Sequence, residues 1–206
     1  MVFIFKRIIC FALAAIFILS GSYLLRVYAQ QQNLAEKLIR LHVIANSDSE
    51  EDQKKKLTVR DAVLTEVDII TDKTENVRDA EQTIRASLPQ IQKAAEIALR
   101  AAGDESKVTV TLTKEPYATR YYDTFTLPAG TYLSLRVCIG EAKGHNWWCV
   151  VFPSLCEAAT TEEFYQSAEA AAFTDEETDE ISSGETKYVL KFKSLELLQR
   201  LLSKFS

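Results

Sequence analysis

Residues 140–156 constrain the fold of this chain more than any other segment. They contain both tryptophans, one of the two histidines and two of the four cysteines. Alternation along an expected strand at 146–152 makes both of its faces apolar. The two faces carry Trp147, Cys149 and Val151 on one side and Trp148, Val150 and Phe152 on the other. Such a strand lies either in the centre of a sheet or against a partner protein.

Two glycines indicate how this strand is connected. Gly140 and Gly144 favour a turn, so we expect residues 131–139 and 146–152 to pair as a hairpin. The simplest interpretation is a buried core hairpin, and the alternative is a recognition surface.

The N-terminus has the order of a secretory signal, with Lys6 and Arg7 before an apolar run at 8–19. Small residues up to Ala29 favour cleavage there. The alternative is an uncleaved anchor, because 18 residues separate Arg7 from Arg26. We therefore expect residues 1–29 to be a signal peptide or membrane anchor outside the fold. Residues 30–206 then form a single exported α+β domain, with membrane contact only through 1–29 if these are retained.

The composition limits which classes of molecule this chain can bind. The chain has 206 residues, 47% of them hydrophobic, which is enough for one domain with a real core. Its net charge is −5 and no stripe of Lys and Arg is present, so nucleic acid is not an expected partner.

The first half of the exported part predicts a strand and helices. Residues 38–45 alternate as a strand, and a capping box of Ser47 and Glu50 begins a helix. That helix is expected to turn Leu57 inward, among other apolar residues. A second helical pattern at 76–102 is interrupted at Pro89, where a kink or a break is expected.

The second half changes to the period of strands. Strands or extended segments are expected at 107–113, 117–127, 131–139 and 146–152. The C-terminal part predicts a helix at 161–172, an acidic loop at 175–185, a strand at 187–192 and an amphipathic helix at 194–205. The fold class is therefore α+β, in which an N-terminal strand and helices precede an antiparallel sheet, a C-terminal strand and an amphipathic helix.

Catalytic and cofactor motifs are absent from the sequence. There is no G-x-S-x-G elbow and no glycine-rich phosphate loop. His145, Cys149 and Cys156 lack the C-x-x-C spacing of a zinc site. We therefore expect no catalytic residue, no metal and no cofactor.

The first strand and the turn after it give a second group of candidates. His42 lies on the face opposite Leu41, where it is expected to be a hydrogen-bonded surface histidine or a partner contact. Asn46 and Asp48 belong to a cluster of capping residues that can also contact a partner.

Two stretches resemble the stage II sporulation protein R family. The first is Ile-Arg-Leu-His-Val-Ile-Ala-Asn-Ser-Asp-Ser at 39–49, with Val-Arg-Asp-Ala-Val-Leu at 59–64. The second includes Leu-Pro-Ala-Gly at 127–130, Asn-Trp-Trp-Cys at 146–149 and Leu-Cys at 155–156. The resemblance covers residues 38–156. One departure is Ser154, where the family usually has a second proline.

The resemblance also bears on the cysteines. Three remain after export, where disulfides persist, and either Cys149–Cys156 or Cys138–Cys149 suits the sequence. Cys149 and Cys156 belong to the family pattern and Cys138 does not, so the resemblance favours Cys149–Cys156.

The resemblance implies a signalling function. Proteins of this family are made in the forespore and exported into the space between the two sporangial membranes. There they activate a membrane-embedded aspartic protease that processes the precursor of the mother-cell sigma factor. The expected contact residues are His145, Asn146, Trp147 and Trp148, with His42, Asn46 and Asp48 as a second patch. The alternative is an exported hydrolase of cell-wall material, with Asp48, Asp61 and His42 as its ionisable groups.

Overall fold

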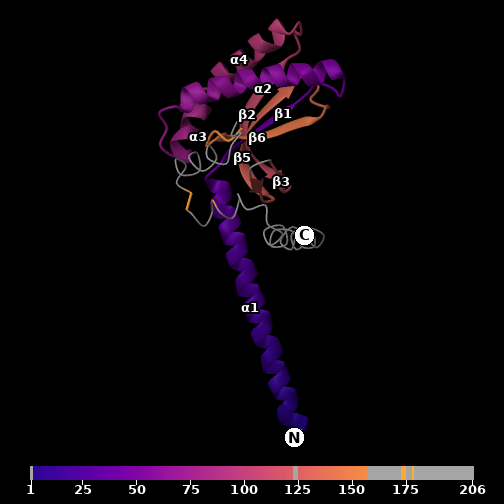
Figure 1. Cartoon of the computed structure of the whole chain (residues 1–206), viewed down its shortest axis with the longest axis vertical. Coiled ribbons are helices and arrows are strands. Elements are labelled where there is room, and N and C mark those ends of the chain that lie inside the picture. The colour runs from indigo at the N-terminus through magenta and orange to yellow at the C-terminus, as the bar shows by residue number, and fades with distance from the viewer. Residues whose placement is uncertain (1, 123–124, 157–172, 175–177, 179–206) are drawn as a thin grey trace.

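A computed structural model describes residues 2–122, 125–156, 173, 174 and 178 (Figure 1). The elements, in order, are α1 (Val2–Glu36), β1 (Ile39–Ile44), α2 (Glu50–Thr71), α3 (Val77–Ala86), α4 (Leu88–Ala101), β2 (Val108–Tyr117), β3 (Arg120–Tyr121), β4 (Thr126–Leu127), β5 (Gly130–Ile139) and β6 (Asn146–Phe152). The expected α+β class is confirmed. The elements expected after residue 160 lie outside the described residues, except for Thr178 within the acidic segment.

The main sheet has the order β2-β5-β1-β6. β1 is parallel to β5 and antiparallel to β6, and β2 is antiparallel to β5. The expected hairpin of β5 and β6 is therefore wrong, because β1 lies between them. The connection at 140–145 is long enough to span the roughly 10 Å that separates two strands with a third between them. β1 is buried at all six positions and pairs along both of its edges.

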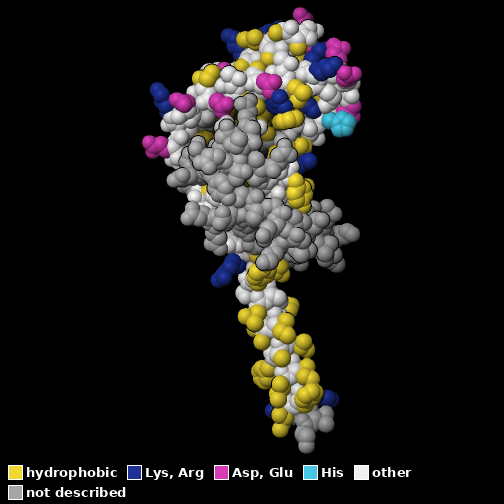
Figure 2. All heavy atoms as spheres, viewed as in Figure 1, with side chains coloured by type: hydrophobic (Ala, Val, Ile, Leu, Met, Phe, Trp, Pro, Cys, Tyr) yellow, Lys and Arg dark blue, Asp and Glu magenta, His cyan; other side chains and the backbone are white. Residues whose placement is uncertain are grey.

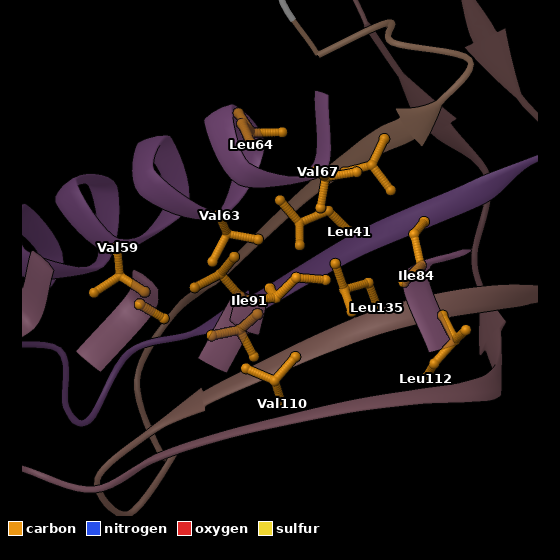
Figure 3. Close-up of a cluster of buried hydrophobic side chains, with 14 of the residues drawn as sticks. Leu41, Val59, Val63, Leu64, Val67, Ile84, Ile91, Val110, Leu112 and Leu135 are labelled. Carbon is orange, nitrogen blue, oxygen red and sulfur yellow. The ribbon is translucent and has the colours of Figure 1, made fainter. Parts of the chain in front are cut away.

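One face of the sheet packs against the helices (Figure 3). Leu41 of β1 and Leu135 of β5 contact a stripe of α2 that includes Val59, Val63 and Val67. Ile39, Leu41 and Val43 share one face of β1, and all three lie in this cluster. Leu57 was expected to point inward and does not: its side chain is 36% exposed, because the buried stripe of α2 runs through Val59 instead.

The other face of the sheet holds a second cluster that includes the end of α1. Val27, Leu34 and Leu38 pack there with Tyr132 and Val150, among others. Val27, which lies within the segment expected to be a signal peptide or anchor, is buried in this cluster. From Ile4 to Glu36, α1 is long and apolar enough to cross a membrane, as expected for a signal peptide or an anchor.

β6 is an edge strand of the described sheet rather than a central one. Both of its faces are nonetheless packed, since the helix-side cluster covers one and the second cluster the other. A register shift places Val150 opposite Arg40 and Phe152 opposite Ile39. This bulge turns Phe152 to the helix side, which differs from strict alternation.

The helix ends follow local chemistry. Ser49, not Ser47, caps α2: its Oγ accepts a hydrogen bond from the Asp52 N–H at 3.1 Å. The pattern at 76–102 breaks into α3 and α4 next to Pro89, as expected. Gly103 follows α4 with a φ of +78°, in the left-handed region that suits a helix C-terminus.

Candidate functional site

Two loops lie side by side at one end of the sheet. The first loop, 45–49, follows β1, and the second loop, 140–145, joins β5 to β6. The Gly144 N–H donates to the Ala45 carbonyl at 2.9 Å, and the Lys143 N–H donates to the Asn46 carbonyl at 3.2 Å. Backbone hydrogen bonds therefore join segments about a hundred residues apart in the sequence into one unit, the loop pair.

Glycines are needed where the two loops touch. Gly140 has a φ of +56°, and a Cβ there would collide with the Asn46 side chain. A Cβ on Gly144 would collide with the backbone carbonyl of Ser47. The glycines that were expected to make a hairpin turn instead allow the two loops to approach closely, Gly140 at the Asn46 side chain and Gly144 at the Ser47 backbone.

Asn46 and Asp48 fasten the second loop. Asn46 Oδ1 accepts a hydrogen bond from the Glu141 N–H at 3.0 Å, and its Nδ2 donates to Asp52 Oδ2 at 3.0 Å. Asp48 Oδ1 accepts a hydrogen bond from the His145 N–H at 2.6 Å and lies 2.6 Å from His145 Nδ1. Asp48 of one predicted patch thus holds His145 of the other.

Asp52 supports the loop pair from the first turn of α2. Its carboxylate accepts hydrogen bonds from Ser47 Oγ at 2.5 Å and from Asn46 Nδ2. These bonds favour the charged form and hold the pKa of Asp52 below its usual range, despite partial desolvation.

Lys56 is buried beneath the second loop. Its Nζ donates to the His145 carbonyl at 3.1 Å and to Gln53 Oε1 at 2.6 Å. Burial lowers the pKa of Lys56, and the nearby Arg60 charge lowers it further. The sequence suggested no such role, because Lys56 belongs to a run of three lysines typical of an exposed helix face.

The two tryptophans lie on opposite faces of β6, and both are half-buried. The guanidinium of Arg60 lies 4.1 Å from the ring centroid of Trp147, a cation–π contact on the helix side. On the other side, Trp148 stacks on His42 with ring centroids 3.8 Å apart, and Arg120 lies 4.9 Å from the ring of Trp148.

His42 is hydrogen-bonded on both sides of its ring, as expected, but it is buried rather than at a surface, with 7% of its area exposed. Nδ1 lies 3.1 Å from Glu115 Oε2, and Nε2 lies 3.0 Å from Asn146 Oδ1. Arg136 continues this row, 3.4 Å from Glu115 Oε1. Each strand of the main sheet therefore contributes one polar side chain to a row that ends at the loop pair.

Comparison with known proteins decides the family. The model for Stage II sporulation protein R (spore_II_R) matches residues 35–162. Stage II sporulation protein R of Bacillus subtilis (strain 168) is 32% identical over 158 residues, which is 77% of this chain and 67% of that protein. The chain belongs to the stage II sporulation protein R family. Its role accordingly lies in sporulation. No solved structure matches it.

The family match contains the whole loop pair and both tryptophans, and it begins only at the end of α1. The structure has the disulfide that the family resemblance favours, Cys149–Cys156, with its Cα atoms 5.3 Å apart. This bond ties the end of β6 to the segment that follows. Cys138 is a free thiol on β5.

The groups named for a hydrolase are not joined into one site. Asp48 pairs with His145, Asp61 accepts a hydrogen bond from Arg60, and His42 is held by Glu115 and Asn146. Among the described residues, no three His, Cys, Asp or Glu side chains are grouped to hold a metal ion. The family and this geometry do not favour the hydrolase alternative.

Sequence reasoning also missed Arg40, a fully buried arginine of β1. Its guanidinium lies 4.0 Å from the ring of Tyr117 and 5.0 Å from that of Tyr132, and Nη2 donates to the Tyr122 hydroxyl at 2.5 Å. Burial raises the pKa of Tyr117 to about 12. These phenols stay neutral, and the aromatic cluster rather than a carboxylate accommodates the charge among the described residues.

Proposed function

We propose that this chain is an exported signalling protein of endospore formation. It binds the outward-facing part of a membrane-embedded aspartic protease, which then processes the precursor of the mother-cell sigma factor. Membership of the stage II sporulation protein R family supports the sporulation role. The observation that carries the binding role is the loop pair, which brings the candidates Asn46, Asp48 and His145 together beside the start of β6.

The exposure of these residues supports recognition by a protein. The side chain of His145 is 76% exposed and that of Asp48 is 58% exposed, although both are held in place by hydrogen bonds. Half-buried tryptophans next to them provide apolar area whose position is already fixed. A preorganised surface with aromatic anchors is typical of protein interfaces, since little ordering entropy is lost on binding.

Activation then requires a difference in affinity. A ligand shifts the protease toward its active state only if it binds that state more tightly than the inactive one. A chain that acts in this way needs no catalytic group of its own.

The test is reconstitution of the three components. The full chain, the candidate protease and the sigma precursor would be co-expressed, and precursor cleavage would be followed on immunoblots. We expect cleavage only when all three are present. Cleavage that is independent of this chain would contradict the proposed function.

Variants locate the contact. His145→Ala is expected to reduce cleavage at least tenfold without a change in melting temperature, because this exposed side chain contributes little to the core. For Trp148→Ala, both folding and cleavage are measured, because a half-buried side chain can serve the core, the contact surface or both. Ile97→Ala, at an exposed position of α4, is the control and should leave both unchanged. Normal cleavage by folded His145→Ala and Trp148→Ala variants would exclude the loop pair as the contact surface.

A further inference from the structure

We propose that α1 is retained as a membrane anchor that is continuous with the core of the domain, so that the signal acts while tethered to a lipid bilayer. The structure distinguishes two parts of α1 by the burial of their side chains. These parts meet near Arg26, three residues before the cleavage site expected from the sequence.

The first part suits a bilayer. From Ile4 to Leu19 the large apolar side chains are exposed around the helix, as Phe11 and Phe17 illustrate. Figure 2 shows hydrophobic side chains along this stalk, while charged side chains gather on the opposite end of the molecule. The 18 residues between Arg7 and Arg26 span about 27 Å as a helix, close to the roughly 30 Å of a hydrocarbon core.

The second part belongs to the domain. Val27, Gln31, Leu34 and Ala35 repeat at helical spacing and are all nearly fully buried. Their neighbours in the second cluster come from the folded domain and include Leu127, Tyr132 and Leu155. Leu24, one turn before Val27, packs against the same cluster. The core of the domain therefore begins before residue 29.

Cleavage after Ala29 conflicts with this packing. Val27, two residues before the end of the expected signal, is only 2% exposed. A product cut after Ala29 would lack the contacts that Leu24 and Val27 make in the second cluster. Retention leaves these contacts intact and places the apolar stalk in lipid.

The continuity of α1 with the domain also fixes how the domain is oriented relative to the membrane. β1 begins three residues after α1 ends and extends about 20 Å to the first loop. Figure 1 shows α1 leaving the domain away from the helices that cover the sheet. The loop pair lies at the end of β1 that is farther from α1. If the proposed function holds, an anchored chain presents its contact surface away from its own membrane.

Fractionation and mass measurement test retention. The full chain with a C-terminal tag would be isolated from sporulating cells at the time of precursor processing. We expect the intact mass, with or without the initiator methionine, in membranes that release it to detergent but not to high salt. A product that lacks residues 4–25, wherever the cut lies, or release by salt alone would overturn the proposal. Processing scored in the same cells tests the proposed function separately.

A matched pair of variants tests continuity with the core. In the detergent-solubilised full chain, Val27→Ala is expected to lower the melting temperature by about 2–4 °C. Tyr28→Ala removes a larger side chain one position away, but Tyr28 is exposed and should leave the melting temperature unchanged. Equal melting temperatures for the two variants would overturn the continuity of α1 with the core.

Discussion

Gly144 illustrates how one residue without a side chain determines the candidate surface. Gly144→Ala would place a methyl group against the Ser47 carbonyl, so the two loops would have to separate. We expect a loss of about 1–3 kcal/mol in the free energy of unfolding, measured by chemical denaturation. Gly21→Ala is the control, because a Cβ there meets no atom within 4 Å. A Gly144→Ala variant as stable as the parent would show that the loops do not need this close contact.

Asp52 predicts how the loop pair responds to acid. Its pKa is lowered in the folded protein, so its contribution is fully present above the ordinary value of 3.8 and is lost as the pH falls through the folded value. Protonation removes an acceptor from Ser47 and Asn46. The tryptophan fluorescence of the folded chain should therefore change below pH 3.8.

Asp52→Asn is the matched comparison for this acid response. The variant cannot titrate at this position and should lack that component of the fluorescence change. An identical acid profile in both proteins would rule out Asp52 as the group responsible.

Individual roles were predictable to different degrees. That His42 is hydrogen-bonded followed from its face of the strand. Its partner Glu115 could not be predicted, because it lies 73 residues away and no local pattern connects the two positions. Lys56 reads as one of three solvent-facing lysines, and only the tertiary packing of the second loop over α2 buries it. Local patterns predict which face a residue occupies, and long-range packing decides what it touches there.

At the scale of elements, the main feature that the sequence predicted wrongly was the order of strands in the sheet. Alternation identified β1, β5 and β6 within a residue or so, but the order of strands depends on which edges meet. Gly140 and Gly144 are compatible with a tight hairpin and with the wider loop that is observed. The burial of β1 on both faces and both edges decides between them, and that property belongs to the assembled sheet.

The disulfide gives a prediction at this scale. Cys149–Cys156 closes a short loop at the end of β6, so reduction should lower the free energy of unfolding by roughly 2–3 kcal/mol. Denaturation curves with and without a reductant measure this loss. Cys138→Ser should show the same sensitivity to the reductant. Loss of that sensitivity in Cys138→Ser would mean that a different pair of cysteines is bonded.

At the scale of the whole molecule, β1 lies between the two apolar clusters and couples them. Val63→Ala in the helix-side cluster is expected to cost about 2 kcal/mol. Because the sheet is shared, amide hydrogen exchange should then become faster at residues 31–35 of α1, in the other cluster, as well as in β1. Leu57→Ala, at an exposed position of the same helix, should leave both unchanged.

Exchange that became faster only on the helix side would contradict this coupling. It would show two independently unfolding parts in place of one cooperative unit.

The central place of β1 also has a consequence for the order in which the fold can form during synthesis. Ile39 is among the first residues to emerge after α1, but its partners Leu133 and Phe152 come much later in the chain. Until these residues have been synthesised, β1 has no neighbouring strand, and the loop pair has only one of its two loops. Under the proposed function, a chain that has not yet presented β6 is therefore unable to signal.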